Sequence, residues 1–411
     1  MRKISYDVIV IGGGAAGLMA AGVASSLGKS VLLLEKMEKV GRKIRITGKG
    51  RCNITNNKSK EEFLSKVRSG ADFLDYAFDR FSNYDTVNLF EKIGLRTLLE
   101  RGGRIFPQSG DAWDVVRALE GWCVKNGVEV CCTSEVSSIE EKDGAIQGVV
   151  IGGNTIAAPK VIVATGGFSY PSTGSTGDGC RFAHALGHSI VPVRPSLVPF
   201  EIDYKDISSL TGLLLKNIEL SLFADGVEVD KEMGEVEFFN FGIGGASTFK
   251  LSRKGVDVVD EGKNVEFHID LKPALSVAKL KGRFFREVEA DARLTISMLL
   301  RKLMPSPIIP LVVSQIAMSS NTLVSKLSDN EIIHVIEVIK SVKLKVLDHR
   351  GFREAIVTAG GVDLSQVDNK TMESKIVKGL FFAGEVLDID ADTGGYNLQL
   401  AFSTGHLAGT V

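Results

Sequence analysis

The sequence has no long hydrophobic run, no pairing pattern among its cysteines and no excess of charge of one sign. Its 411 residues include 49 Lys and Arg against 50 Asp and Glu, a net charge of −1. This balance gives no overall electrostatic signature for nucleic acid or an anionic membrane. The N-terminal apolar run is too short to span a bilayer, and glycines follow it where a signal peptide needs its cleavage region. We therefore expect a globular, cytoplasmic protein without membrane attachment.

Cysteine and metal-ligand patterns are also missing. The five cysteines are odd in number and show no C-x-x-C spacing, so a disulfide framework is not indicated. No group of His, Cys and Asp has the spacing of metal ligands, and we predict no metal site. The chain is too long for one ordinary core, which predicts two or three domains.

The opening of the chain reads as a β-strand, an α-helix and a second β-strand. An apolar, β-branched run at 6–11 meets a glycine cluster, a small-residue helix follows at 15–28, and a second strand follows at 30–35. This order predicts an α/β fold with a parallel sheet. Further along, the periodicity predicts helices over 60–100 and 109–125, and then a β-meander that ends in a buried strand at 161–165.

The residue pattern changes near Val191, where three prolines lie within eight residues. Segments with alternating apolar and polar residues, typical of strands, follow. A helical stretch comes next, and the glycine-rich texture of the opening returns at 358–364. We read a discontinuous first domain over 1–192 and 352–411. The insertion comprises a β domain over 193–275 and 341–351, and a helical subdomain over 276–340.

The first motif that carries chemistry is Gly12-x-Gly14-x-x-Gly17, between the first strand and the helix, with Glu35 at the end of the second strand. Gly12 permits the tight turn, Gly14 lets the backbone approach a pyrophosphate, and Gly17 lets helix and strand pack closely. The helix N-terminus favours phosphate, and the carboxylate can accept from ribose hydroxyls. The alternative is a glycine-rich turn in another kind of α/β protein. Because the strand, the helix and the acidic residue are all present, we favour a dinucleotide-binding site.

A second motif lies near the other end of the chain, at 379–409. A strand delivers Gly384 and Glu385, and the pair Gly394 and Gly395 opens a helix that runs through His406. Such a helix end would stabilise negative charge on a reduced flavin. The alternative is a buried packing helix with ordinary capping.

The stretch at 41–56 holds five basic side chains, no acidic one and a single cysteine, Cys52. We expect its cations to face an anion, since charge-assisted hydrogen bonds are stronger than neutral ones; the alternative is a solvated basic loop. Because Arg51 flanks Cys52, we expect a depressed thiol pKa and a role as acid, base or nucleophile. The alternative is that Cys52 only packs against the flavin ring.

Four segments together resemble a known family, the BaiN/RdsA-like flavoproteins, also called aminoacetone oxidase family FAD-binding enzymes. The resemblance rests on IGGGAAGLMAA, GRKIRITGKGRCNITN, ATGGFSYPSTGSTGDG and TMESKIVKGLFFAGEVLDIDADTGGYNLQLAFSTGHLAG. It implies FAD bound by a two-dinucleotide-binding-type, Rossmann-like domain, with a β-barrel-like domain and a helical domain inserted.

The resemblance also implies site residues, motif by motif. The residues implied to bind the ADP half of FAD are Gly12, Gly14, Gly17 and Glu35. The loop near pyrophosphate and flavin comprises Arg42, Lys43, Thr47, Gly48, Arg51, Cys52 and Asn53. The flavin side is completed by Gly384, Glu385, Gly395, Tyr396 and Asn397. We expect further cofactor contacts from Ala15, Ala16, Lys36, Val136, Thr165, Gly166 and Leu398.

The sequence departs from the family pattern at three positions. Asn240 and Ala246 stand where the family usually has His and Pro, and Lys49 stands where glycine is common. If that His binds substrate or moves protons, this chain has a different substrate or a weaker activity. Since no second G-x-G-x-x-G motif is visible, a nicotinamide donor would bind transiently in the flavin cleft.

The first functional hypothesis is a reductase that passes hydride from NAD(P)H through FAD to an activated C=C bond, with Cys52 or Tyr396 as proton donor. The resemblance implies uridine in ribosomal RNA, or a small enone, as the substrate. Lys279, Lys281, Arg283 and Arg286 could form an RNA surface, or only the solvated face of a helix. The alternatives are an amine or aminoketone oxidase that uses oxygen, and a non-catalytic, flavin-bound redox protein. The oligomeric state is left open.

Overall fold

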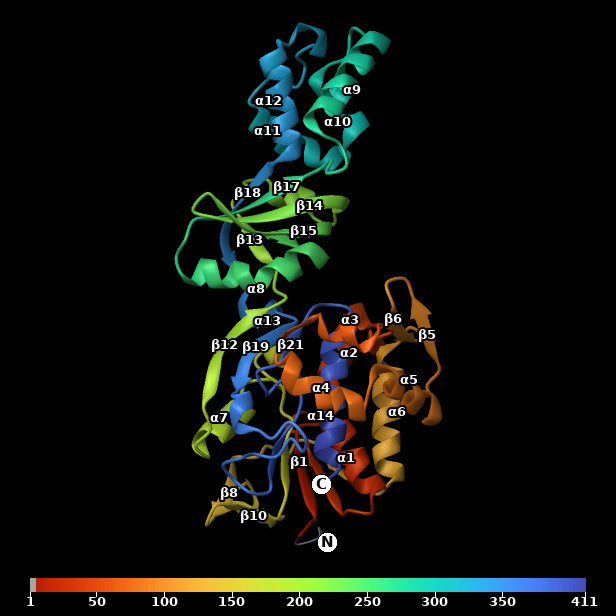
Figure 1. The fold of residues 1–411 in the computed structure, drawn as a ribbon, viewed down its shortest axis with the longest axis vertical. Coiled ribbons are helices and arrows are strands. Elements are labelled where there is room, and N and C mark those ends of the chain that lie inside the picture. Colours follow the sequence, from red (N-terminus) through yellow and green to blue (C-terminus); the bar gives the residue numbers. More distant parts are fainter. Residues whose placement is uncertain (1–4) are drawn as a thin grey trace. The chain divides into compact units, whose positions relative to one another are not determined.

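The computed structural model describes residues 5–411, and the chain divides into two compact units. The first unit comprises the residues up to Ser196 together with Phe352–Val411, and the second comprises Leu197–Gly351. The chain thus leaves the first unit once and returns to it once (Figure 1). None of the helices within 5–411 has the length and the apolar content needed to cross a bilayer.

The first unit is built on a five-stranded sheet in the order β20-β11-β1-β2-β7, in which every neighbouring pair is parallel. Its strands are β1 Val8–Ile11, β2 Val31–Leu34, β7 Glu129–Cys131, β11 Val161–Val163 and β20 Leu380–Phe382. Both faces of the central strands are buried, which is typical of a parallel sheet and explains their continuous runs of Val, Ile and Leu. The predicted βαβ opening is confirmed.

Two helices from opposite ends of the chain, α1 Ala15–Ser26 and α14 Tyr396–Gly409, pack directly against each other. Small residues allow this, because a Cβ on Gly405 would lie 2.5 Å from the carbonyl oxygen of Ala16. On its other side, α1 contacts α6 Ala112–Lys125. The beginning and the end of the chain therefore share one core.

Smaller elements complete the first unit. Its short helices are α2 Arg42–Ile46, α3 Lys60–Leu64, α4 Ala71–Arg80, α5 Asn83–Lys92 and α7 Asp178–Ala185, and α13 Gly351–Glu354 begins at the boundary. Its antiparallel strands are β3 Thr55–Asn56, β4 Val67–Ser69, β5 Thr97–Glu100, β6 Arg104–Pro107, β8 Ser138–Lys142, β9 Ala145–Ile151, β10 Asn154–Ala157, β12 Ile190–Ser196, β19 Val357–Val362 and β21 Asp390–Ala391.

The second unit contains a closed barrel in the strand order β13-β16-β15-β14-β17-β18. Its strands are β13 Phe200–Ile202, β14 Leu214–Ala224, β15 Val227–Phe238, β16 Gly242–Gly244, β17 Val265–Asp270 and β18 Val342–His349. Helix α8 Ala246–Asp260 packs on β15. Between β17 and β18 the chain forms α9 Val277–Ala290, α10 Ile296–Leu303, α11 Ile309–Ile316 and α12 Asp329–Lys340.

Three local predictions are wrong. The range 60–100 is not helical throughout, since it contains β4, which pairs with distant β21, and β5, which pairs with β6. The strand at 161–163 does not end the β-meander but joins the central sheet beside β1. The change of texture at Val191 falls inside β12, which pairs with β19 in the first unit. In each case a partner far away in the sequence decides the structure.

Candidate functional site

A cavity of about 1290 Å³, open solvent at its mouth included, lies in the first unit. Its walls come from the β1–α1 turn, the end of β2, helix α2, the segment after β11, and the β20–α14 connection. These segments gather at the carboxyl ends of the parallel strands, where open α/β sheets bind their ligands.

The β1–α1 turn has the geometry that a pyrophosphate requires. Gly12 has a φ of 102°, and a Cβ there would lie 2.5 Å from the carbonyl oxygen of Ala164. A Cβ on Gly17 would lie 1.8 Å from the carbonyl oxygen of Gly12. Gly14 is the N-cap of α1, makes no side-chain cap, and would have nothing within 4 Å of an added Cβ. The free N–H groups of the first helical turn therefore meet open space at the cavity wall.

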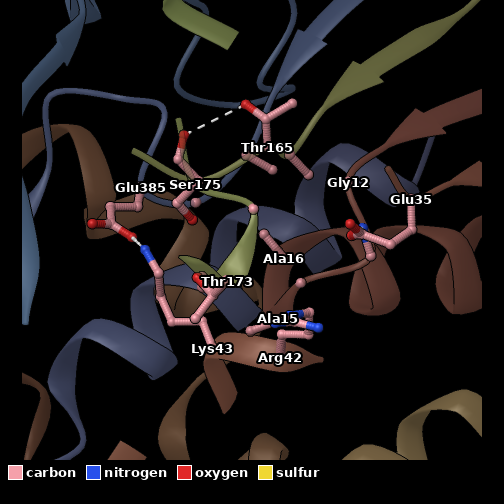
Figure 2. Close-up of a pocket in the computed structure, with 18 of the residues that line it drawn as sticks. Gly12, Ala15, Ala16, Glu35, Arg42, Lys43, Thr165, Thr173, Ser175 and Glu385 are labelled. Carbon is pink, nitrogen blue, oxygen red and sulfur yellow. Dashed lines mark hydrogen bonds and ion pairs between the residues drawn. The ribbon is translucent and has the colours of Figure 1, made fainter. Parts of the chain in front are cut away.

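Glu35 lies at the end of β2, beside Gly12 in the cavity (Figure 2). Its carboxylate accepts hydrogen bonds from the backbone N–H of Gly13 and of Met37, each 2.8 Å long. Burial raises the pKa of Glu35, and these two hydrogen bonds oppose the shift only in part. Each oxygen keeps a free lone pair for a further donor such as a ribose hydroxyl.

Glu385, which follows β20, is held by side chains and backbone of the protein itself. Its Oε2 atom lies 2.8 Å from Nζ of Lys43, an ion pair that Figure 2 shows across the cavity wall. Its Oε1 atom accepts from the hydroxyl of Ser169 at 2.6 Å and from the backbone N–H of Thr358 at 2.7 Å. Burial opposes ionisation of Glu385, but the charge of Lys43 and these hydrogen bonds outweigh it, so its pKa is lowered.

The cations of the 41–56 stretch separate into two groups. Arg42 and Lys43 line the cavity. Arg45 does not, because its guanidinium lies 3.6 Å from the centre of the Trp113 ring. Arg51 pairs with Glu100, and its guanidinium lies 4.4 Å from the centre of the Phe106 ring. Arg45 and Arg51 therefore lie outside the cavity lining, and that these cations face an anion stays a prediction.

The predicted direction of the pKa shift at Cys52 is corrected by the structure. Its side chain is fully buried in the core, and burial raises the pKa of the thiol to about 12. The prediction of a depressed pKa is wrong, because the neighbouring Arg51 turns outward to Glu100 while Cys52 turns inward. Tyr396 is also buried, and burial raises the pKa of its phenol. Neither side chain lines the cavity.

The cavity gathers many of the predicted residues and leaves others behind its wall. Those that line it are Gly12, Gly14, Ala15, Ala16, Glu35, Lys36, Arg42, Lys43, Thr47, Val136, Thr165, Gly166, Gly384, Glu385, Asn397 and Leu398. Those outside the lining are Gly17, Gly48, Arg51, Cys52, Asn53, Gly395 and Tyr396. Two of the three departures from the family pattern, Asn240 and Ala246, lie in the second unit, where Asn240 is an exposed turn residue and Ala246 begins α8.

Sequence reasoning missed a set of polar wall residues: Ser134, Glu135, Thr173, Ser175 and Asp178. Asp178 forms an ion pair with Lys36 at 2.6 Å. The Ser/Thr/Gly-rich segment before α7 was visible in the sequence, and its position after a buried strand could have placed it at the same sheet edge. Nothing local in the sequence indicated Ser134 or Glu135.

This fold and this cavity define the class of dinucleotide-binding Rossmann proteins. The chain belongs to the HI0933-like Rossmann domain family, which it matches over residues 6–411. It is 32% identical over 406 residues to the 3-dehydro-bile acid delta(4,6)-reductase of Clostridium scindens, covering 97% of each chain. It is 31% identical over 404 residues to the ribosomal RNA dihydrouridine synthase of Haemophilus influenzae, covering 97% of this chain and 96% of the relative.

The fold is also shared with a solved dehydrogenase. The 3-ketosteroid delta1-dehydrogenase of Sterolibacterium denitrificans aligns over 99% of both chains, with a TM-score of 0.57 and 15% identity. The open N-terminus of α1 and the available oxygens of Glu35 fit the diphosphate and the ribose of a dinucleotide. Family membership and this fit support FAD as the cofactor, and the chain is an FAD-dependent oxidoreductase.

Proposed function

We propose that this chain is a reductase that uses NAD(P)H and FAD to saturate a C=C bond conjugated to a carbonyl group. The observation that carries the proposal is the shared chemistry of the two full-length relatives. A bile acid delta(4,6)-reductase and a dihydrouridine synthase, by their names, both add hydrogen to such a bond. FAD, when bound, accepts hydride from a donor and passes it to the acceptor carbon.

The residues on the cavity wall support this chemistry by holding the cofactor. The N-terminus of α1 and Arg42 would bind the diphosphate, and Glu35 would accept from a ribose hydroxyl. Lys43 is fixed in place by Glu385, so that its charge is held at the cavity wall without further reorganisation. The donor would bind transiently, since the first unit has one G-x-G-x-x-G turn.

Saturation of the bond needs a proton as well as a hydride, and we propose Tyr396 or Cys52 as its donor. A raised pKa keeps both groups protonated at neutral pH, as a general acid must be. Loss of a general acid typically slows such a step by about 10²–10⁴-fold. We expect Tyr396→Phe or Cys52→Ala to slow reoxidation of the reduced protein by substrate, in single-turnover stopped flow, without changing flavin content. If both variants keep the wild-type rate, neither group is the acid.

We propose uridine in ribosomal RNA as the substrate, which also agrees with a cytoplasmic protein. The test is nucleoside mass spectrometry of ribosomal RNA from a deletion strain, its parent and a complemented strain. Loss of dihydrouridine on deletion and its return on complementation are expected. An unchanged dihydrouridine content would reject this substrate.

A second candidate substrate is a small enone, favoured by the relative named as a bile acid reductase. Here the purified protein should oxidise NADH or NADPH in the presence of an oxo-Δ4 steroid, and mass spectrometry should detect a product two hydrogens heavier. Rapid bleaching of the flavin by amines with peroxide release would instead indicate the oxidase alternative. Failure of every donor to reduce the flavin would indicate a non-catalytic redox protein.

A further inference from the structure

A basic hairpin projects from the first unit (Figure 1), and its strand β6 pairs with β3, which follows Cys52 in the chain. It consists of residues 96–107, with β5 and β6 joined by a turn at Arg101, and we call it the arginine hairpin. In the three-stranded sheet β3-β6-β5, the strand β5 is an edge strand. Its adjacent side chains Leu98 and Leu99, which point to opposite faces, are 47% and 55% exposed.

Three arginines of the hairpin, Arg96, Arg101 and Arg104, are exposed. Among residues 5–411, which the structure describes, none of the three forms an ion pair. The only acidic residue in the hairpin is Glu100, and its charge is met by Arg51. Arg96 and Arg101 flank the four residues of β5 and are therefore about 16 Å apart along the strand. The hairpin therefore presents an extended row of unneutralised guanidinium groups.

The hairpin is hydrogen-bonded to residues 54–56, which follow Cys52 in the chain. The buried side chain of Asn56 donates to the carbonyl oxygen of Gly102 in the hairpin turn at 3.2 Å, and to that of Gly394, before α14, at 3.0 Å. The backbone N–H of Ile54 donates to the carbonyl oxygen of Ile105 at 2.8 Å. A ligand bound to this hairpin would thus lie next to residues 54–56, which contact both the hairpin and Gly394, before the N-terminus of α14.

We infer that the arginine hairpin binds the phosphate backbone of an RNA substrate beside the flavin cavity. The inference rests on the proposed function. It is argued from charge complementarity, because guanidinium groups bind phosphate in a bidentate manner and are favoured where phosphate is recognised. The exposed leucines supply apolar contact area at the edge strand. The chain as a whole is neutral, so a local cluster of this kind is what binding to RNA requires.

A competing surface exists in the second unit. Lys279, Arg283 and Arg286 of α9 line a shallow groove together with Glu287. There, however, Glu287 forms an ion pair with Lys302 at 2.6 Å and lies 3.8 Å from Arg283. These contacts place an acidic group inside the groove, so this face is less suited to phosphate than the hairpin.

The test compares two triple variants that remove the same charge. The hairpin variant carries Arg96→Gln, Arg101→Gln and Arg104→Gln. The α9 variant carries Lys279→Gln, Arg283→Gln and Arg286→Gln. Ribosomal RNA purified from the deletion strain is titrated against the flavin-loaded proteins at several salt concentrations. Each lost contact to single-stranded phosphate reduces the slope of log affinity against log salt by roughly 0.7. We expect the hairpin variant to bind at least about tenfold more weakly, with a slope reduced by about 2, and the α9 variant to bind like wild type.

Flavin absorbance and the rate of flavin reduction should stay at wild-type values in both variants, which separates RNA binding from folding. Unchanged RNA affinity of the hairpin variant, or a loss confined to the α9 variant, would overturn the inference. So would a wild-type dimer that the hairpin variant converts to a monomer, since the edge strand would then pair with a second copy. RNA binding by the wild type without dihydrouridine formation would reject the proposed function alone.

Discussion

Two carboxylates that line the cavity, Glu35 and Glu385, differ in their hydrogen-bond partners and in the direction of their pKa shifts. Glu35 receives hydrogen bonds only from backbone N–H groups, and its pKa is raised by burial. Glu385 is met by the ammonium of Lys43, a hydroxyl and a backbone N–H, and its pKa is lowered despite burial. Both follow a strand of the central sheet, so their sequence positions are equivalent and their surroundings differ.

This difference indicates that Glu35 is available to bind a ligand, whereas Glu385 holds together parts of the protein itself. Glu35 has spare acceptor capacity and no fixed cation, which suits a ribose hydroxyl. Glu385 already accepts from three partners within the protein, and it positions Lys43 at the cavity wall. The predicted contact of Glu385 with the flavin side remains a prediction, while its contact with Lys43 links two segments 342 positions apart in the sequence.

Burial suppresses ionisation most clearly at Cys52, where only a hydrogen bond with the Thr47 side chain opposes it. With a pKa of about 12 in place of 9.0, its thiolate fraction at pH 8 falls by about 10³-fold. We expect Cys52 to be alkylated by iodoacetamide at least that much more slowly in the native protein than in urea. Peptide mass spectrometry reads the sites separately, and half-buried Cys131 provides an internal reference. Rapid native labelling of Cys52 would show that its burial is wrong.

The pair of Lys43 and Glu385 should matter most for stability. Lys43→Met leaves a buried carboxylate without its cation, and because the pair is partly exposed we expect a loss of about 2 kcal/mol, or roughly 30-fold in the folding equilibrium. Chemical denaturation of the flavin-loaded protein measures this loss. Lys60→Met is the matched control, since its partners Asp75 and Asp79 are more than half exposed, and we expect at most about 1 kcal/mol there. Equal losses of stability in the two variants would show that the pair of Lys43 and Glu385 contributes no more than an exposed ion pair.

Glu35→Gln should act on the cofactor rather than on the fold. The amide keeps one acceptor oxygen but loses the charge, which weakens a charge-assisted hydrogen bond to ribose by about 1.5 kcal/mol, or roughly tenfold in FAD affinity. Reconstitution of the apoprotein with FAD, followed by fluorescence, gives the dissociation constant. Glu129→Gln, which removes a carboxylate charge beside Tyr6 and away from the cavity, is the control and should bind FAD like wild type. Unchanged affinity in Glu35→Gln would remove this carboxylate from the site.

The smallest effect, and the most direct test of the comparison, is the dependence of stability on pH. Because the pKa of Glu35 is raised in the folded state, its contribution is present below about pH 4.5 and is lost as pH rises through the folded value. The pKa of Glu385 is lowered, so its contribution is present above about pH 4.5 and is lost as pH falls through the folded value. Urea denaturation from pH 3.5 to 7 should therefore give difference curves of opposite slope for Glu35→Gln and Glu385→Gln against wild type. Slopes of the same sign would contradict the assignment.

The sequence predicted best where local pattern and chemistry coincide. The first strand, its glycine turn and the following helix need particular residues at particular spacings, and they appear as predicted in β1 and α1. The edge strand β5 was missed because its pairing with β6 is tertiary context, and a helical period was read across it. The thiol of Cys52 was misjudged because adjacency to Arg51 in the sequence does not make the two groups face each other.

The sequence by itself determined the class of fold, the family and the half of the site that begins at Gly12, because glycine spacing and strand periodicity are local properties. Only the tertiary structure decided which charges meet. It brought Lys43 to Glu385 across 342 positions and turned Arg45 onto Trp113. Within residues 5–411 it left the arginines of the hairpin without an ion pair. Electrostatic interactions and burial depend on distances through space, and these are set only when segments from both ends of the chain pack into one core.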